Sequence, residues 1–121
     1  MDERRAQKVS ETLREELTEI IGFEMADPRL DLVDITDVRV SPDLRHATVR
    51  VALGGDRPTQ DQALETLDRA KHFLRRELAR RLSFRRVPEL HFQADTDLEP
   101  GGRLEVLLRR AKKTQGKREN P

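Results

Sequence analysis

The sequence predicts a small α+β domain in which helices pack on one face of a three-stranded sheet. Three observations support this class. The chain has 121 residues, which is the length of one domain. Its apolar residues follow helical or strand spacing in the order helix, strand, strand, helix, helix, strand. Four Phe are its only aromatic residues, so the core is expected to be modest and mostly aliphatic.

The first predicted element is an amphipathic helix over residues 4–25. Its apolar residues recur at three- and four-residue spacing, and its opposite side is highly charged. Asp27-Pro28 closes the helix, because proline disfavours the α conformation of the residue before it. The recurring apolar residues are Ala6, Val9, Leu13, Leu17, Ile20 and Ile21.

Residues 32–41 and 46–53 are predicted to form an antiparallel hairpin with one buried face. The alternation of the first strand slips phase between Ile35 and Val38, which predicts a bulge there. Ser41-Pro42-Asp43 is typical of a turn. The second strand alternates cleanly, and its predicted inward residues are Ala47, Val49, Val51 and Leu53.

Two helices separated by a break are predicted over residues 59–82. Thr59 and Gln62 resemble a capping box, so the first helix is expected to begin at Thr59. In one continuous helix, Lys71 would point from the apolar face and Phe73 would point outward among arginines. Burying an ammonium group is costly, so we expect a break at residues 70–72, which would remove this conflict. The alternative is a continuous helix whose basic residues form a solvated face. The first helix should bury Ala63, Leu64, Leu67 and Ala70.

A last strand is predicted over residues 89–95, with Leu90, Phe92 and Ala94 facing inward. Six of the ten residues from 109 to 118 are basic and none is acidic, so this end of the chain is expected to be mobile. The predicted organisation is a domain over residues 1–98, a loop and short helix over 99–111, in which 103–111 are helical, and a disordered basic tail over 112–121.

Positive charge is concentrated in residues 69–86. This stretch holds eight Lys or Arg against the single acid Glu77, a net charge of +7, whereas the whole chain carries only +1. The rest of the protein therefore sums to −6. Such asymmetry is more informative about partners than the net charge is.

Several classes of protein are disfavoured. The chain has no cysteine, which excludes disulfides and thiolate chemistry. No apolar run approaches the roughly 20 residues that span a bilayer, and the N-terminus lacks the apolar segment of a signal peptide, so a soluble cytoplasmic protein is expected.

The sequence offers little for catalysis. His46, His72 and His91 fall on different predicted elements without metal-ligand spacing, so each is expected to be a surface residue rather than a catalytic or metal-binding one. A hard-cation site at Asp95, Asp97 and Glu99, or a metal-dependent hydrolase built on the two aspartates, is disfavoured because the Gly and the closing Glu of a calcium loop are missing. We expect no enzymatic activity and no cofactor.

The basic stretch predicts nucleic-acid binding. Arginines displace counterions from phosphates and hydrogen-bond phosphate oxygens, while the scarcity of aromatic residues argues against recognition by base stacking. The alternative is an interaction module that binds other proteins rather than RNA. The predicted RNA-binding residues are Arg69, Lys71, His72, Arg75, Arg76, Arg80, Arg85, Arg86, Lys112 and Lys113.

Several short motifs occur in the order found in a known family. They are Asp27-Pro-Arg-Leu30, Ile35-Thr-Asp-Val38, Val40-Ser-Pro-Asp-Leu-Arg-His-Ala47, Leu74-Arg-Arg-Glu-Leu78 and Arg86-Val-Pro-Glu-Leu-His-Phe92, followed by Asp95. From about residue 4 to 97 the chain resembles the bacterial ribosome-binding factor A family.

This resemblance implies a single KH-like domain of type II topology, with a kinked helix pair on a three-stranded sheet. It also implies a non-enzymatic assembly factor, expected to be a monomer without membrane or small-molecule partners. Such a factor would bind the small (30S) ribosomal subunit and its 16S rRNA, promote maturation of the rRNA 5′ end and support growth in the cold. In the alternative, the interaction module would bind ribosomal proteins rather than RNA. KH domains clamp the nucleic-acid backbone with a GxxG loop. The family resembled here has an Ala-x-Gly kink instead, but this chain has Ala70-Lys71-His72, without the glycine.

Overall fold

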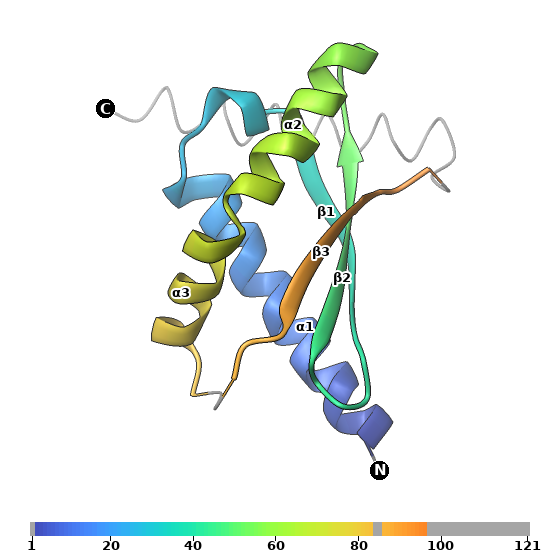
Figure 1. The fold of residues 1–121 in the computed structure, drawn as a ribbon, viewed down its shortest axis with the longest axis vertical. Helices are drawn as coiled ribbons and strands as arrows, with labels where there is room; N and C mark the ends of the chain where they lie inside the picture. The colour runs from blue at the N-terminus through green and yellow to red at the C-terminus, as the bar shows by residue number, and fades with distance from the viewer. Residues whose placement is uncertain (1, 84–85, 97–121) are drawn as a thin grey trace.

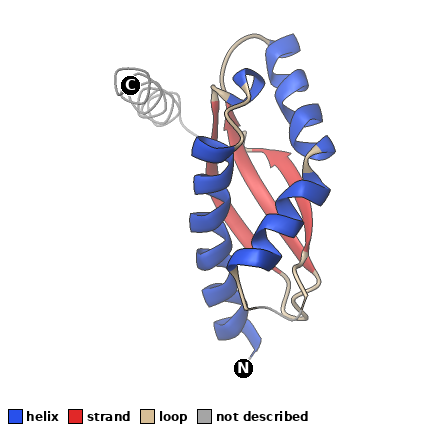
Figure 2. Cartoon of the chain, turned by 90° about the vertical axis from the view of Figure 1, so that its left-hand side faces the viewer, coloured by secondary structure: helices blue, strands red, loops and turns tan. Residues whose placement is uncertain are grey.

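The structure of the protein, a computed structural model, describes residues 2–83 and 86–96. Its helices all lie on one face of a three-stranded sheet (Figures 1 and 2), which confirms the predicted α+β class. The described elements are α1 (Asp2–Glu19), a π-helical turn (Ile20–Glu24), a 3-10 turn (Pro28–Leu30), β1 (Val33–Val40), β2 (His46–Leu53), α2 (Arg57–Arg69), α3 (Lys71–Arg81) and β3 (Glu89–Ala94).

The sheet has the strand order β1-β2-β3, so β2 is central. β1 and β2 form the predicted antiparallel hairpin, and its register shifts between Ile35 and Asp37, which confirms the predicted bulge. β3 runs parallel to β2. A parallel neighbour requires a crossover connection, and α2 and α3 provide it.

The core between the helices and the sheet is aliphatic, as predicted. The last turn of the first helical segment widens into the π-helix, which ends with Met25 as its C-cap, and Asp27 caps the Pro28 turn that follows. α1 is fastened to β1 by Ser10, whose hydroxyl accepts a hydrogen bond of 2.9 Å from the Val40 backbone N–H. The largest fully buried side chains are Leu13, Leu17, Ile20, Leu30, Leu67, Leu74, Leu78, Leu90, Val49, Val51 and Pro88.

The predicted N-cap of α2 is wrong by three residues. Asp56, not Thr59, is the N-cap, because its carboxylate accepts a hydrogen bond of 2.9 Å from the Thr59 backbone N–H. Arg57 and Pro58 therefore form the first turn, where the missing N–H of proline costs nothing. Thr59 belongs to the helix that it was expected to cap.

The predicted break is confirmed. α2 ends at Arg69, α3 begins at Lys71, and Ala70 between them has φ −84° and ψ 0°. Its backbone N–H is shared between the carbonyl oxygens of Thr66 and Leu67, each at 3.1 Å. Since φ is negative here, any residue can form this bend, and no glycine is needed.

The break resolves only half of the predicted conflict. Lys71 is half-buried and its Nζ lies 2.8 Å from the Asp68 carboxylate, so its charge is paired. Phe73 was expected to lose its outward position, but it is 38% exposed. The buried Leu74 is the next residue of α3, and a step of about 100° along the helix turns Phe73 away from the core.

Among the described residues, no helix is both long and apolar enough to cross a membrane. The helix predicted over residues 103–111 and the tail over residues 112–121 lie outside the described residues, as does the rest of 97–121.

Candidate nucleic-acid interface

The outer face of α3 carries a stripe of exposed basic side chains. His72, Arg76 and Arg80 follow one another at four-residue spacing and all three are exposed. Each lies two residues from a buried leucine of the same helix, a rotation of about 200° that turns the stripe away from the core. Arg80 pairs with Glu77 on the same helix at 3.2 Å. We call His72, Arg76 and Arg80 the α3 stripe.

Two further predicted residues flank the break. Arg69 is exposed and pairs with Glu65 one turn earlier in α2. The hydrogen bond from Lys71 holds the pKa of the Asp68 carboxyl below its ordinary value. An exposed ion pair such as that between Arg69 and Glu65 contributes little to stability. A phosphate can therefore compete with the Glu65 carboxylate for Arg69.

Arg75 is turned differently from its neighbour Arg76. It is half-buried, and its Nη2 donates a hydrogen bond of 3.0 Å to the Val87 carbonyl. Its Nε is buried without a hydrogen-bond partner in the described part of the chain. The guanidinium thus fastens α3 to the segment that enters β3, and this leaves less of it open to a ligand.

Arg81 is a basic residue whose role sequence reasoning missed. Its guanidinium reaches Glu16 at 3.1 Å, Glu19 at 3.8 Å and also Glu24, all on the first helical segment. A hydrogen bond to Glu16 is the main cause that raises the pKa of Arg81. The four-residue spacing along α3 could have indicated an ion pair between Arg81 and Glu77. Nothing in the sequence indicates that α1 lies beside Arg81. Arg81 therefore joins α3 to α1.

Arg86 lies beyond the end of α3 rather than at the break. It is exposed and lines a cleft of about 350 Å³ together with Arg5 of α1 and Arg45 of the β1–β2 turn. Sequence reasoning missed Arg5 and Arg45 because they come from segments far apart in the chain. The predicted residues Arg85, Lys112 and Lys113 lie outside the described residues.

The three histidines lie on three different elements, as predicted, but two of them are neighbours in space. His72 lies apart from the other two, on α3, but His46 and His91 lie side by side on β2 and β3, with ring nitrogens 3.1 Å apart. The register of the parallel strands brings the two histidines together, and their spacing along the chain does not reveal this contact.

Of the three carboxylates in the disfavoured cation site, only Asp95 lies in the described residues, and Asp97 and Glu99 lie outside them. Asp95 accepts a hydrogen bond of 2.6 Å from the Thr36 hydroxyl and pairs with Arg50 at 3.2 Å.

This arrangement is suited to binding a phosphate backbone. Arginine side chains can displace counterions and hydrogen-bond phosphate oxygens in a fork. Phe73 is exposed one helical turn before Arg76, so one aromatic ring is available to stack on a base or ribose. The fold and this surface define a KH-like α+β domain whose broken helix pair has a basic outer face.

Comparisons with known proteins identify the family. Residues 5–108 match the family described as Ribosome-binding factor A, and the chain belongs to that family. A curated relative of this name from Solibacter usitatus is 53% identical over 121 residues, which cover 100% of this chain and 98% of the relative.

One crystal structure and one homology model are similar to this chain. The crystal structure of ribosome-binding factor A from Thermus thermophilus has a TM-score of 0.68 and 32% identity, covering 78% of this chain and 99% of that chain. A homology model of the Thermus thermophilus ribosome binding factor A, fitted into a cryo-EM map of a 30S complex, has a TM-score of 0.54 and 34% identity, covering 68% of this chain and 90% of that chain.

Proposed function

We propose that this protein is a non-catalytic assembly factor that binds the small ribosomal subunit through its 16S rRNA. In this proposal it acts in the cytoplasm as a monomer and without a cofactor, promotes maturation of the rRNA 5′ end and supports growth in the cold. Membership of the Ribosome-binding factor A family supports it, as does a similar structure described in a 30S complex.

The α3 stripe is the observation that carries the proposal. Three cationic or titratable side chains lie exposed on one face, directly after the break where KH domains approach nucleic acid. Neighbouring basic residues are engaged within the fold, Arg75 with the Val87 carbonyl and Arg81 with the acids of α1. Of these four arginines of α3, Arg76 and Arg80 are therefore the two whose side chains face solvent.

Reversing the stripe tests the site. The double variant Arg76→Glu, Arg80→Glu should weaken binding to small subunits at least about tenfold, because two charge-assisted contacts are lost and two repulsions are added. Co-sedimentation with purified subunits measures this loss. A matched control is Arg39→Glu, Arg57→Glu, which makes the same change of charge at two exposed residues on β1 and at the start of α2. Equal binding by both double variants would refute the site.

The same variants test the role in maturation. A strain that lacks the protein should accumulate 16S rRNA with an unprocessed 5′ end and grow poorly in the cold. The control variant should restore both, and the stripe variant should restore neither. Normal processing in the strain that lacks the protein would contradict the proposed role while leaving subunit binding intact.

Binding to protein-free 16S rRNA separates RNA recognition from recognition of ribosomal proteins. If RNA is the partner, the logarithm of the affinity should fall by about 0.7 to 0.9 per logarithmic unit of salt for each phosphate contact. Binding to intact subunits without binding to the free rRNA would favour ribosomal proteins as the partner.

A further inference from the structure

Three potential metal ligands project from the face of the sheet that the helices leave uncovered. The parallel register pairs His46 of β2 with Glu89 of β3, and Thr48 with His91. Paired residues, and residues two apart on one strand, place their side chains on the same face. Ala47 and Leu90, next to them in the chain, are fully buried on the opposite face. His46, Glu89 and His91 therefore share the outer face, and we call them the His-Glu-His cluster.

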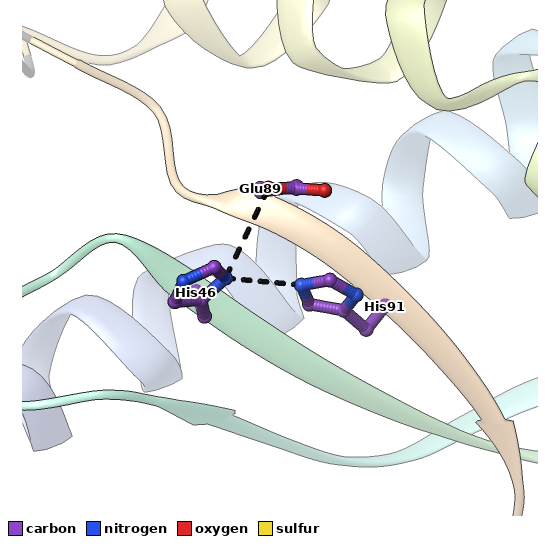
Figure 3. A group of neighbouring side chains, drawn as sticks. All are labelled: His46, Glu89 and His91. Atoms are coloured by element: carbon purple, nitrogen blue, oxygen red, sulfur yellow. Dashed lines mark hydrogen bonds and ion pairs between the residues drawn. The ribbon is translucent and has the colours of Figure 1, made fainter.

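The side chains of this cluster converge (Figure 3). His46 Nδ1 lies 3.1 Å from His91 Nε2 and 3.9 Å from a Glu89 carboxylate oxygen. One ligand atom from each residue fits within a span of 4.8 Å. In a tetrahedral zinc site with Zn–N distances of about 2.0–2.1 Å, two ligand nitrogens are about 3.3 Å apart. The spacing of the two imidazoles is therefore close to that of a zinc-bound pair.

The ligand types of the cluster suit one divalent cation. Two imidazole nitrogens this close either form one N–H···N hydrogen bond or both direct their lone pairs at a single metal ion. The Glu89 carboxylate adds negative charge to the same place. Two nitrogens and one oxygen suit a borderline ion such as Zn²⁺, whereas Mg²⁺ and Ca²⁺ prefer ligand sets made of oxygen.

The backbones that carry these ligands are held by hydrogen bonds. The His46 N–H donates to the Ser41 hydroxyl at 3.1 Å, and its carbonyl accepts from the Ser41 N–H at 2.9 Å. The Glu89 N–H donates to the Arg45 carbonyl at 2.8 Å. The cluster therefore sits near the starts of two strands that are tied to the turn between β1 and β2.

We propose that His46, His91 and Glu89 bind one Zn²⁺ ion on the outer face of the sheet. The three protein ligands leave the remaining coordination position to water. The bound ion cross-links β3, an edge strand of the described sheet, to the central strand β2. It stabilises the folded chain because the three ligands are brought together only by the parallel pairing.

Titration calorimetry with Zn²⁺ on the tag-free full-length protein tests the site. We expect one ion per chain, and His46→Gln and His91→Gln should each weaken binding at least tenfold. His72→Gln is a matched control, because His72 is the only other histidine of the chain and lies on α3. The chain has no cysteine, so no thiolate competes for the ion.

Thermal unfolding gives an independent readout. Zn²⁺ should raise the midpoint of the wild type and of His72→Gln but not that of His46→Gln or His91→Gln, while all four should unfold at similar temperatures with a chelator present. The proposal is overturned if the wild type binds no stoichiometric Zn²⁺. Binding that His46→Gln and His91→Gln leave unchanged would also overturn it.

Discussion

At the scale of single residues, Arg80 and Arg81 are adjacent yet serve different purposes. The Arg80 side chain is 78% exposed and pairs with Glu77 of its own helix, whereas that of Arg81 is 23% exposed and reaches the acids of α1. A network of several charges stabilises a fold more than an isolated surface pair does. We therefore expect Arg80 to contribute to ribosome binding and Arg81 to contribute to the stability of the fold.

Single alanine substitutions should reveal this difference. Arg81→Ala should lower the thermal midpoint by on the order of 5 °C, because the link between α1 and α3 is lost, and should leave ribosome binding by the folded protein nearly unchanged. Arg80→Ala should weaken ribosome binding several-fold and shift the midpoint by less than about 2 °C. Calorimetric melting and co-sedimentation measure the two effects. The reverse pattern would mean that the roles are exchanged.

At the scale of elements, the two ends of α2 position the stripe. The helix begins at the Asp56 cap, after Gly55 with φ +86°. A Cβ at Gly55 would meet the Thr59 side chain at 2.9 Å, so both the conformation and the space require glycine. At the other end Ala70 breaks the helix without glycine, and His72 occupies an ordinary helical position. The chain thus keeps the break while placing an imidazole where its family resemblance implies a glycine.

The Asp56 cap makes part of the stability depend on pH. Hydrogen bonds from the Thr59 side chain and backbone hold the pKa of Asp56 below its ordinary value. A carboxyl whose pKa is lowered by folding stabilises the protein above its unfolded pKa of about 3.9, and this stabilisation is lost as pH falls through the folded pKa.

Asp56→Ala should therefore lower the thermal midpoint by a few degrees at pH 7, roughly as expected for loss of an N-cap. The difference from the wild type should shrink below about pH 4 and nearly vanish once Asp56 is protonated. Asp56→Asn, which keeps a capping oxygen, should lose less at pH 7. Melting curves from pH 7 to pH 2.5 give the comparison, and a difference that is constant with pH would contradict the charged cap.

At the scale of the whole molecule, positive charge is distributed over separate places. The α3 stripe lies on the helical side, whereas Arg5, Arg45 and Arg86 meet in a cleft beyond the end of α3. The most basic segment of the remaining sequence is residues 109–118, outside the described residues. A partner that contacts all of these places must be extended and negatively charged, as a folded rRNA is.

The salt dependence of rRNA binding should count the contacts of the C-terminal segment. If Lys112 and Lys113 each neutralise one phosphate, Lys112→Gln, Lys113→Gln should reduce the slope of log affinity against log salt by about 1.5 and weaken binding at low salt. Filter binding across a range of salt measures the slope. An unchanged slope would show that these lysines do not touch the RNA.

The sequence by itself determined the element order, the bulge and the helix break. Each of these follows from local physics: the spacing of Leu67, Leu74 and Leu78, the phase slip between Ile35 and Val38, and the cost of burying Lys71. Local signals were less reliable at a helix end, because the spacing of Thr59 and Gln62 predicted a cap at Thr59 whereas Asp56 caps the helix.

Only the tertiary structure decided which basic residues face solvent and which distant residues meet. Arg75 and Arg81 belong to the same basic stretch as Arg76 and Arg80, but contacts with the Val87 carbonyl and with Glu16 engage them. The parallel pairing of β2 and β3 likewise brings together His46 and His91, which are 45 residues apart. Contacts between residues far apart in the chain depend on which elements become neighbours, and local spacing shows which face of an element is buried but not which element packs beside it.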